Sequence, residues 1–231
     1  MAGEAIEQQE TMKKYRSLLI IIPAICAILA LNGAGTIFRI GVAASSMIVL
    51  LIAYNVKIRK EIWIFIAALF FSIIGDWFLG HRNGIPARFI YGILFFFIGH
   101  AGFLWFSLKN GKINLWVLAL LLAGYLVLFF VMIYPNIDGA ILMVAVLAYL
   151  LISCLSLAAA TGLRFPVLPR NLFVAGIASI VFSDTIIAFS EFAGYREYNW
   201  LIMPTYYLSH ILMTLALILN SNNGIYQTTS K

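Results

Sequence analysis

Long apolar segments alternate with short polar breaks along the whole chain. Eight of these segments have the length and hydropathy of membrane-spanning helices, since a span needs about 20 mostly apolar residues. The breaks contain Gly, Pro, Asn or clustered Lys and Arg, which are turn and charge signals, and none is long enough for a soluble domain. The predicted spans cover residues 17–31, 38–56, 61–79, 88–108, 113–134, 139–163, 171–192 and 200–220.

The composition agrees with a polytopic all-α membrane protein. Hydrophobic residues make up 63% of the chain and charged residues 10%, and the mean hydropathy is +1.00, which excludes an ordinary soluble domain. The net charge of +6 is interpreted as topology and contact with anionic lipid, so no nucleic acid partner is expected. Cys26 and Cys154 lie in apolar segments and are expected to be buried thiols.

The distribution of Lys and Arg predicts the orientation. With a cytoplasmic N-terminus, 11 of the 15 Lys and Arg residues fall on the cytoplasmic side, and only Arg39, Arg82, Arg88 and Arg196 fall on the other. This asymmetry predicts that both termini are cytoplasmic. The apolar stretch after the basic N-terminal region lacks a small-residue cleavage pattern, which favours a retained helix over a cleaved signal peptide.

Two aspartates interrupt segments that are otherwise apolar. Asp76 lies within residues 71–80 and Asp184 within residues 181–190. An ionisable side chain in hydrocarbon costs several kcal/mol, so each is a candidate functional residue. The alternative is that each Asp only hydrogen bonds a neighbouring hydroxyl and holds helices together.

The two aspartates belong to an internal repeat. Gly75 and Asp76 align with Ser183 and Asp184 at an offset of 108, and His100 aligns with His210 at an offset of 110. Because each half then has four spans, the sequence predicts one transmembrane domain over 1–231, built from two parallel four-helix repeats at about 17–108 and 113–220. A two-fold arrangement would bring both aspartates to the repeat interface, between the outer rim and the midplane.

An aspartate pair in a low dielectric suits addition of water. Two nearby carboxylates cannot both be ionised cheaply, so one keeps its proton and the pair supplies an acid and a base. Other polar side chains are candidates for binding or orienting a substrate: His100, Ser183, Tyr206, Tyr207 and His210, with Arg39 as a site for lipid phosphate. For each His, an interhelical hydrogen bond is the alternative role.

The same residues leave a metal site open as an alternative. Asp76, His100, Asp184 and His210 are types that bind zinc, but no HExxH motif or other close His spacing is present, and we predict no metal and no cofactor. The chain also lacks a GxSxG elbow, a P-loop and a glycine-rich dinucleotide turn, so serine hydrolase, ATPase and Rossmann chemistry are unsupported.

Four motifs in order on successive spans carry a resemblance to a known family. They are GDWFLG (75–80), FFFIGHAGF (95–103), FSDTIIAF (182–189) and YYLSHILM (206–213). In their order and spacing the chain resembles the YhhN family, whose eukaryotic members are lysoplasmalogenases. The resemblance covers nearly all eight spans, and a role for His210 goes beyond it because the last motif varies in the family.

The resemblance implies hydrolysis of the vinyl ether bond of lysoplasmalogen to a fatty aldehyde and glycerophosphoethanolamine or glycerophosphocholine, without a metal. The paired aspartates of the family correspond to Asp76 and Asp184. The implied partners are a lysophospholipid substrate and the surrounding membrane lipids. Two alternatives stay open. One is a lipid or small-solute carrier; the other is an intramembrane aspartyl protease, although Ile73 stands where the GxGD signature needs glycine.

Overall fold

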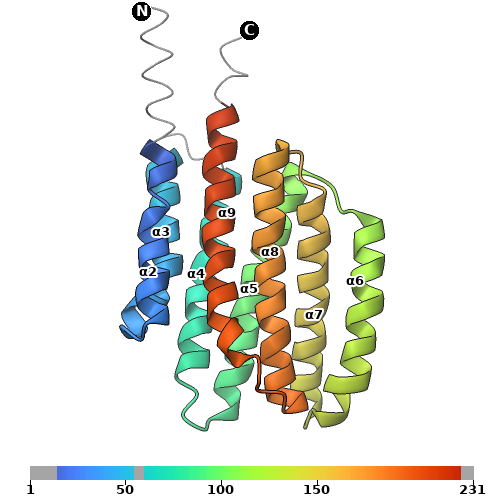
Figure 1. Ribbon diagram of the computed structural model, residues 1–231. Helices are drawn as coiled ribbons and strands as arrows, with labels where there is room; N and C mark the ends of the chain where they lie inside the picture. Colours follow the sequence, from blue (N-terminus) through green and yellow to red (C-terminus); the bar gives the residue numbers. More distant parts are fainter. Residues whose placement is uncertain (1–14, 55–59, 225–231) are drawn as a thin grey trace, which may run out of the picture.

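The chain folds as a bundle of helices (Figure 1). The computed structural model describes residues 15–54 and 60–224, and within them no strand occurs beyond one backbone bridge between Gly111 and Leu163. Residues 129–133 and 189–193 are π-helical turns, and residues 134–136 and 199–201 are 3-10 turns. The helices are α2 (Ile21–Leu31), α3 (Thr36–Tyr54), α4 (Lys60–Gly80), α5 (Pro86–Asn110), α6 (Leu115–Leu128), α7 (Ala140–Thr161), α8 (Val167–Ala188) and α9 (Ile202–Gly224).

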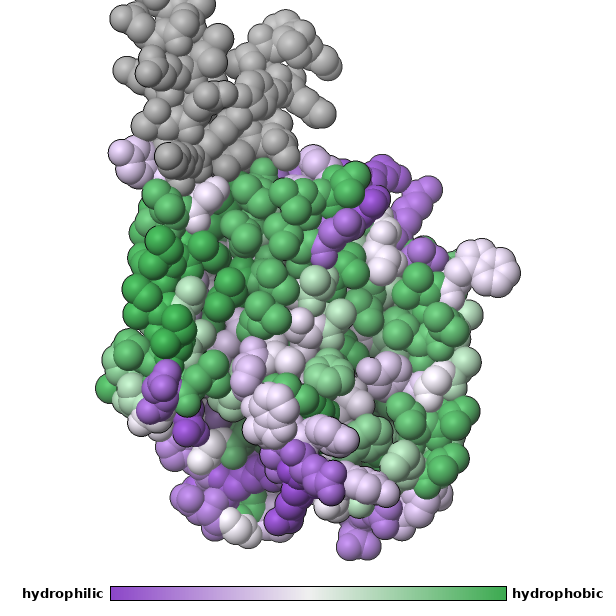
Figure 2. All heavy atoms as spheres, viewed as in Figure 1, coloured by the Kyte–Doolittle hydropathy of each residue, from purple (hydrophilic) through white to green (hydrophobic). Residues whose placement is uncertain are grey.

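The predicted polytopic membrane fold is confirmed. Among the described residues, seven helices are long and apolar enough to cross a membrane, and an eighth apolar helix, Tyr15–Leu31, is shorter. Figure 2 shows apolar side chains covering most of the face in view, with hydrophilic residues gathered toward the two ends of the bundle. Helix α6 contains no buried residue, which is the pattern of a helix that faces lipid along most of its surface.

The ends of the helices follow local sequence signals. Helix α5 has Pro86 in its first turn, where the missing N–H is not needed. The Asn114 side chain caps α6 by accepting a hydrogen bond of 3.3 Å from the backbone N–H of Val117. Helix α8 begins at Val167, four residues before the predicted start, because Pro169 falls in the first turn and is tolerated there.

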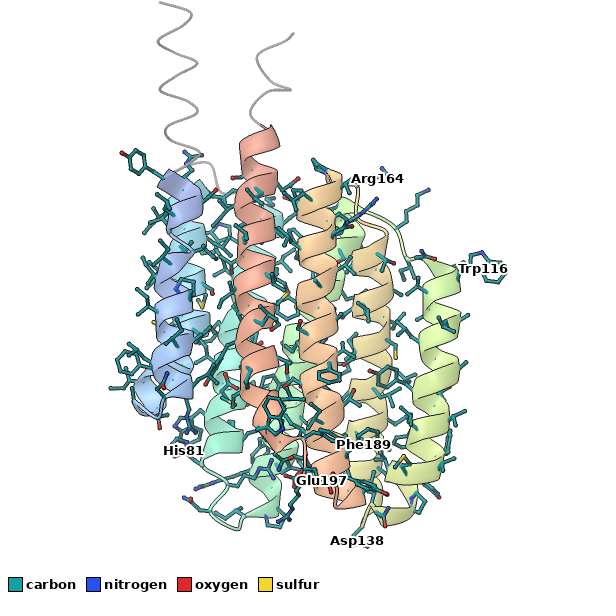
Figure 3. All side chains as sticks on the ribbon, viewed as in Figure 1. His81, Trp116, Asp138, Arg164, Phe189 and Glu197 are labelled. Carbon is teal, nitrogen blue, oxygen red and sulfur yellow. The ribbon has the colours of Figure 1, made fainter. Side chains whose placement is uncertain are left out.

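Both described ends of the chain lie at the same end of the bundle, called the terminal end below (Figure 1). Arg164 lies at this end, whereas His81 and Asp138 lie at the opposite, far end (Figure 3). This agrees with an even number of crossings, and the assignment of the terminal end to the cytoplasm stays a prediction. The predicted cytoplasmic residues Lys13, Lys14, Lys57, Arg59 and Lys231 are outside the described residues.

Two pairs of adjacent helices, α4 with α5 and α8 with α9, form the centre of the bundle. Small residues allow close approach: a Cβ on Gly102 of α5 would lie 2.7 Å from the Ala68 Cβ of α4. Helix α5 packs on α7, and α9 packs on α3. These two contacts are equivalent if α3, α4 and α5 correspond to α7, α8 and α9, and the repeat itself stays a prediction.

An aromatic cluster fills the half of the bundle toward the terminal end. Phe65 of α4 lies 5.2 Å from Phe103 and 5.6 Å from Phe106 between ring centroids, and Phe106 lies 5.4 Å from Phe173 of α8. All four rings are almost fully buried. Asp76, Asp184 and Tyr206 lie beyond this cluster, in the halves of α4, α8 and α9 toward the far end.

Candidate active site

A cavity of about 290 Å³ lies in the half of the bundle toward the far end. Residues of α3, α4, α5, α8 and α9 line it, and it extends to His81, which lies at the far end (Figure 3). Asp76 reaches this cavity from α4 and Asp184 from α8. Asp76 and Asp184 are 108 residues apart in the sequence, and the structure places both in one cavity.

Asp76 is held by a tyrosine from the other half of the chain. The Tyr206 hydroxyl of α9 donates a hydrogen bond of 2.8 Å to Asp76 Oδ2. The backbone beside Asp76 is closely approached by α5, because a Cβ on Gly75 would lie 2.9 Å from the ring of Phe96. A carboxylate in this position receives a donor that replaces part of its lost hydration.

Asp184 has two polar neighbours. The Tyr149 hydroxyl of α7 donates a hydrogen bond of 2.6 Å to Asp184 Oδ2, a length typical of a bond to a charged acceptor. His100 Nε2 of α5 lies 3.4 Å from the same oxygen, which is a polar contact longer than an ordinary hydrogen bond. The Asp184 side chain is 14% exposed, so it remains accessible from the cavity.

His100 is fixed behind Asp184 by its surroundings. Its side chain is 1% exposed, and its ring meets the Tyr149 ring edge to face at 5.2 Å. The Ser156 hydroxyl of α7 donates a hydrogen bond of 2.9 Å to the backbone carbonyl of His100. His100, Tyr149 and Asp184 therefore form one contiguous cluster in which imidazole and phenol both face the carboxylate.

His210 does not repeat this arrangement at Asp76. Its ring packs against Tyr206 at 4.6 Å between centroids, so the predicted shared helix face is present. Among the described residues, the two ring nitrogens of His210 have no hydrogen-bond partner, and the Tyr207 hydroxyl has none either. His210 thus supports the ring of Tyr206, and Tyr206 is the residue that contacts the carboxylate.

The other predicted residues lie on the wall and at the mouth of the cavity. Ser183 lines the wall, but its hydroxyl donates to the Ile202 carbonyl at 3.0 Å. Arg39 lines the cavity from the first turn of α3 and is exposed. Arg82 also lines the cavity, forms an ion pair of 2.8 Å with Glu191, and stacks 4.4 Å above the Phe89 ring. The mouth therefore carries Arg39 and the Arg82–Glu191 ion pair, while Asp76 and Asp184 lie farther from the far end.

Tyr149 is the site residue that the sequence reasoning missed. It lies in an apolar span with no charged residue, in which tyrosine is compositionally ordinary. The available signal was the polar spacing Tyr149 and Ser153, four residues apart on one helix face, and the Ser153 hydroxyl does donate to the Tyr149 carbonyl at 2.8 Å. That pattern alone does not identify which carboxylate the phenol contacts.

The possible metal ligands are not gathered into one set. Within the residues that the structure describes, no three His, Cys, Asp or Glu side chains are grouped so as to hold a metal ion. Asp184 and His100 are neighbours, while Asp76 is bonded to Tyr206 and His210 lies behind that tyrosine. The four predicted ligands are therefore divided between the surroundings of Asp184 and those of Asp76.

Comparison with known proteins identifies the family. No curated protein and no solved structure matches the chain. The sequence profile of the YhhN family matches residues 38–217, from the start of α3 to the last third of α9. This stretch includes both aspartates, His100, Tyr149 and Tyr206. The chain therefore belongs to the YhhN family.

Proposed function

We propose that this protein is a membrane hydrolase of the lysoplasmalogenase type, which cleaves the vinyl ether bond of a lysoplasmalogen. The observation that carries the proposal is the pairing of Asp76 and Asp184 in one cavity, each bonded to a tyrosine. Membership of the YhhN family supports the same reaction class. The products are a fatty aldehyde and glycerophosphoethanolamine or glycerophosphocholine.

The reaction needs an acid and a base near one double bond. The protonated carboxyl gives its proton to the vinyl carbon that continues into the chain, and the other vinyl carbon and the ether oxygen share the positive charge. Water then adds to the oxygen-bearing carbon and loses a proton to a carboxylate. The resulting hemiacetal collapses to the aldehyde as its hydroxyl proton passes to the glycerol oxygen, so the net change is the addition of one water.

The site suits this sequence of steps. A carboxylate close to the substrate stabilises the oxocarbenium ion electrostatically, and this effect is strong where water is scarce. Tyr149 and Tyr206 hold the two carboxylates in fixed positions by their hydrogen bonds. Arg39 and Arg82 at the mouth supply positive charge for the phosphate of a headgroup that lies at the membrane surface.

The decisive experiment measures products from purified protein. Detergent-purified wild type is incubated with lysoplasmenylethanolamine and the choline analogue, and aldehyde and glycerophosphodiester are detected by mass spectrometry. Asp76→Asn and Asp184→Asn should each abolish aldehyde release while the protein still folds and inserts. Asp138→Asn is the matched control, because Asp138 is exposed at the far end (Figure 3) and outside the cavity lining.

Three outcomes would contradict the proposal. Full activity in either aspartate variant would remove the paired mechanism. No aldehyde from folded wild type with either headgroup would remove the reaction, and uptake of labelled lipid into proteoliposomes without hydrolysis would then favour a carrier. Cleavage of a transmembrane peptide in place of the lipid would favour an intramembrane protease.

A further inference from the structure

Two apolar clefts leave the cavity at Asp184. The first, of about 60 Å³, lies among α5, α7 and α8 and shares Leu79, Phe96, Asp184 and Ile187 with the cavity lining. The second, also about 60 Å³, lies among α6, α7 and α8. The two clefts share four lining residues, Val146, Tyr149, Asp184 and Ala188. Both clefts therefore adjoin Asp184, one of the paired carboxylates, and they are called the apolar path below.

Two π-helical turns border this path. Phe192, in the turn that follows α8, lines the first cleft, and Ile133, in the turn that follows α6, lines the second. The two turns pack against each other. A π-helical turn widens a helix locally and is frequent at functional sites, and here both occur where the apolar path is bounded.

The structure of a vinyl ether lipid limits where its headgroup and its aliphatic chain can lie in the cavity and the two clefts. The reacting double bond stands between the glycerol oxygen and the aliphatic chain, so the polar part and the apolar part leave the reacting carbons in opposite directions. The mouth of the cavity carries Arg39, Arg82 and Glu191, which is unsuited to an aliphatic chain. The apolar path begins at Asp184, where the chain must begin.

We propose that the aliphatic chain of the substrate leaves the cavity between α7 and α8, past Ala188 and Val146, and continues along α6 toward the membrane interior. This inference rests on the proposed function and assigns the chain-binding part of the same site. Ala188 lies four residues from Asp184 on α8, or about 6 Å along the helix. Its small side chain leaves the junction of the two clefts open, so this position controls which chains pass.

The test changes the size of residue 188 and compares two substrates. Hexadecenyl and propenyl glycerophosphoethanolamine share the vinyl ether and headgroup, but only the longer chain reaches Ala188. We expect Ala188→Phe to lower the ratio of kcat/KM for the long chain to that for the short chain by about tenfold or more. Ala175→Phe is the matched control, because Ala175 is exposed on the same helix and lines none of these spaces. An unchanged ratio in Ala188→Phe would overturn the inference.

A second measurement does not depend on turnover or on folding of the variant. A saturated ether analogue of the lysolipid with a photoreactive diazirine midway along its chain is bound to wild type and irradiated, and labelled peptides are mapped by mass spectrometry. Labelling in α7 and α8 around Val146 and Ala188 supports the path, and labelling confined to α2 and α3 overturns it. Aldehyde release by wild type is scored separately, so a labelled path without hydrolysis would contradict only the proposed function.

Discussion

Removal of the Tyr149 hydroxyl is the sharpest perturbation that the site offers. Tyr149→Phe keeps the ring that packs on His100 and deletes the hydrogen bond of 2.6 Å to Asp184 Oδ2. The phenol is the nearest donor to that carboxylate, because the His100 contact is longer, at 3.4 Å. The substitution therefore tests whether the position and charge of Asp184 matter for turnover.

The expected size follows from the bond that is lost. A hydrogen bond to a charged group contributes about 1.5–3 kcal/mol, and the remaining imidazole contact recovers part of it, so a loss of about 1.5–2 kcal/mol is expected. This corresponds to a fall in kcat of about 10- to 30-fold. KM should change little, because the hydroxyl bonds to the carboxylate and not to the headgroup region.

The assay is aldehyde release from lysoplasmenylethanolamine under saturating substrate. Tyr54→Phe is the matched control, since its hydroxyl donates to the Leu217 carbonyl at 2.9 Å at the terminal end, away from the cavity. If Tyr149 acts by fixing Asp184, the loss should appear in kcat while KM stays near its wild-type value. Wild-type kcat in folded Tyr149→Phe, or a loss confined to KM, would refute this reasoning.

Three further predictions concern packing, substrate binding and metal. Gly102→Ala should lower the free energy of unfolding by about 1–3 kcal/mol, because the added Cβ would lie 2.7 Å from Ala68 Cβ. The assay is a thermal melt in detergent, with Gly124→Ala as the control because a Cβ there would meet no atom within 4 Å. Equal melting temperatures for the two variants would contradict the prediction. Arg39→Gln should raise KM a few-fold for the phosphate-bearing substrate and leave an alkenylglycerol without phosphate unaffected; equal changes for both would argue against phosphate binding. EDTA should leave aldehyde release intact, whereas loss of activity that zinc restores would favour the metal alternative.

The membrane fold was predictable because the bilayer restricts the chain so strongly. Hydrocarbon demands long apolar helices, and their number and approximate limits follow from hydropathy. The helix starts were less predictable, as at Val167, because a proline in a first turn and a proline in a loop look alike in sequence. The first apolar helix, Tyr15–Leu31, is so short that its length alone does not decide whether it spans the membrane.

The site was predictable only where a residue type was rare for its surroundings. Asp76 and Asp184 stand out because charge in an apolar span is costly, and the predicted repeat led to the expectation that they lie close together. Tyr149 did not stand out, because the chain has 11 tyrosines and an amphipathic ring is unremarkable in a span. Its role depends on the rotation of α7 about its axis, which the low amphipathicity of a lipid-embedded helix does not encode.

Under the predicted repeat, the two aspartates would be equivalent positions with different surroundings. Residues on a two-fold axis contact their own equivalents, and Phe96 and Tyr206, aligned at the same offset as the two histidines, meet edge to face at 6.0 Å beside the cavity. At this shared position one half carries a phenyl ring and the other a phenol, so only Asp76 receives a donor from it. Asp184 obtains its donor from Tyr149 instead, and His100 approaches it while His210 is excluded from Asp76 by the ring of Tyr206. These different contacts lead us to expect that Asp76→Asn and Asp184→Asn will affect turnover by different routes.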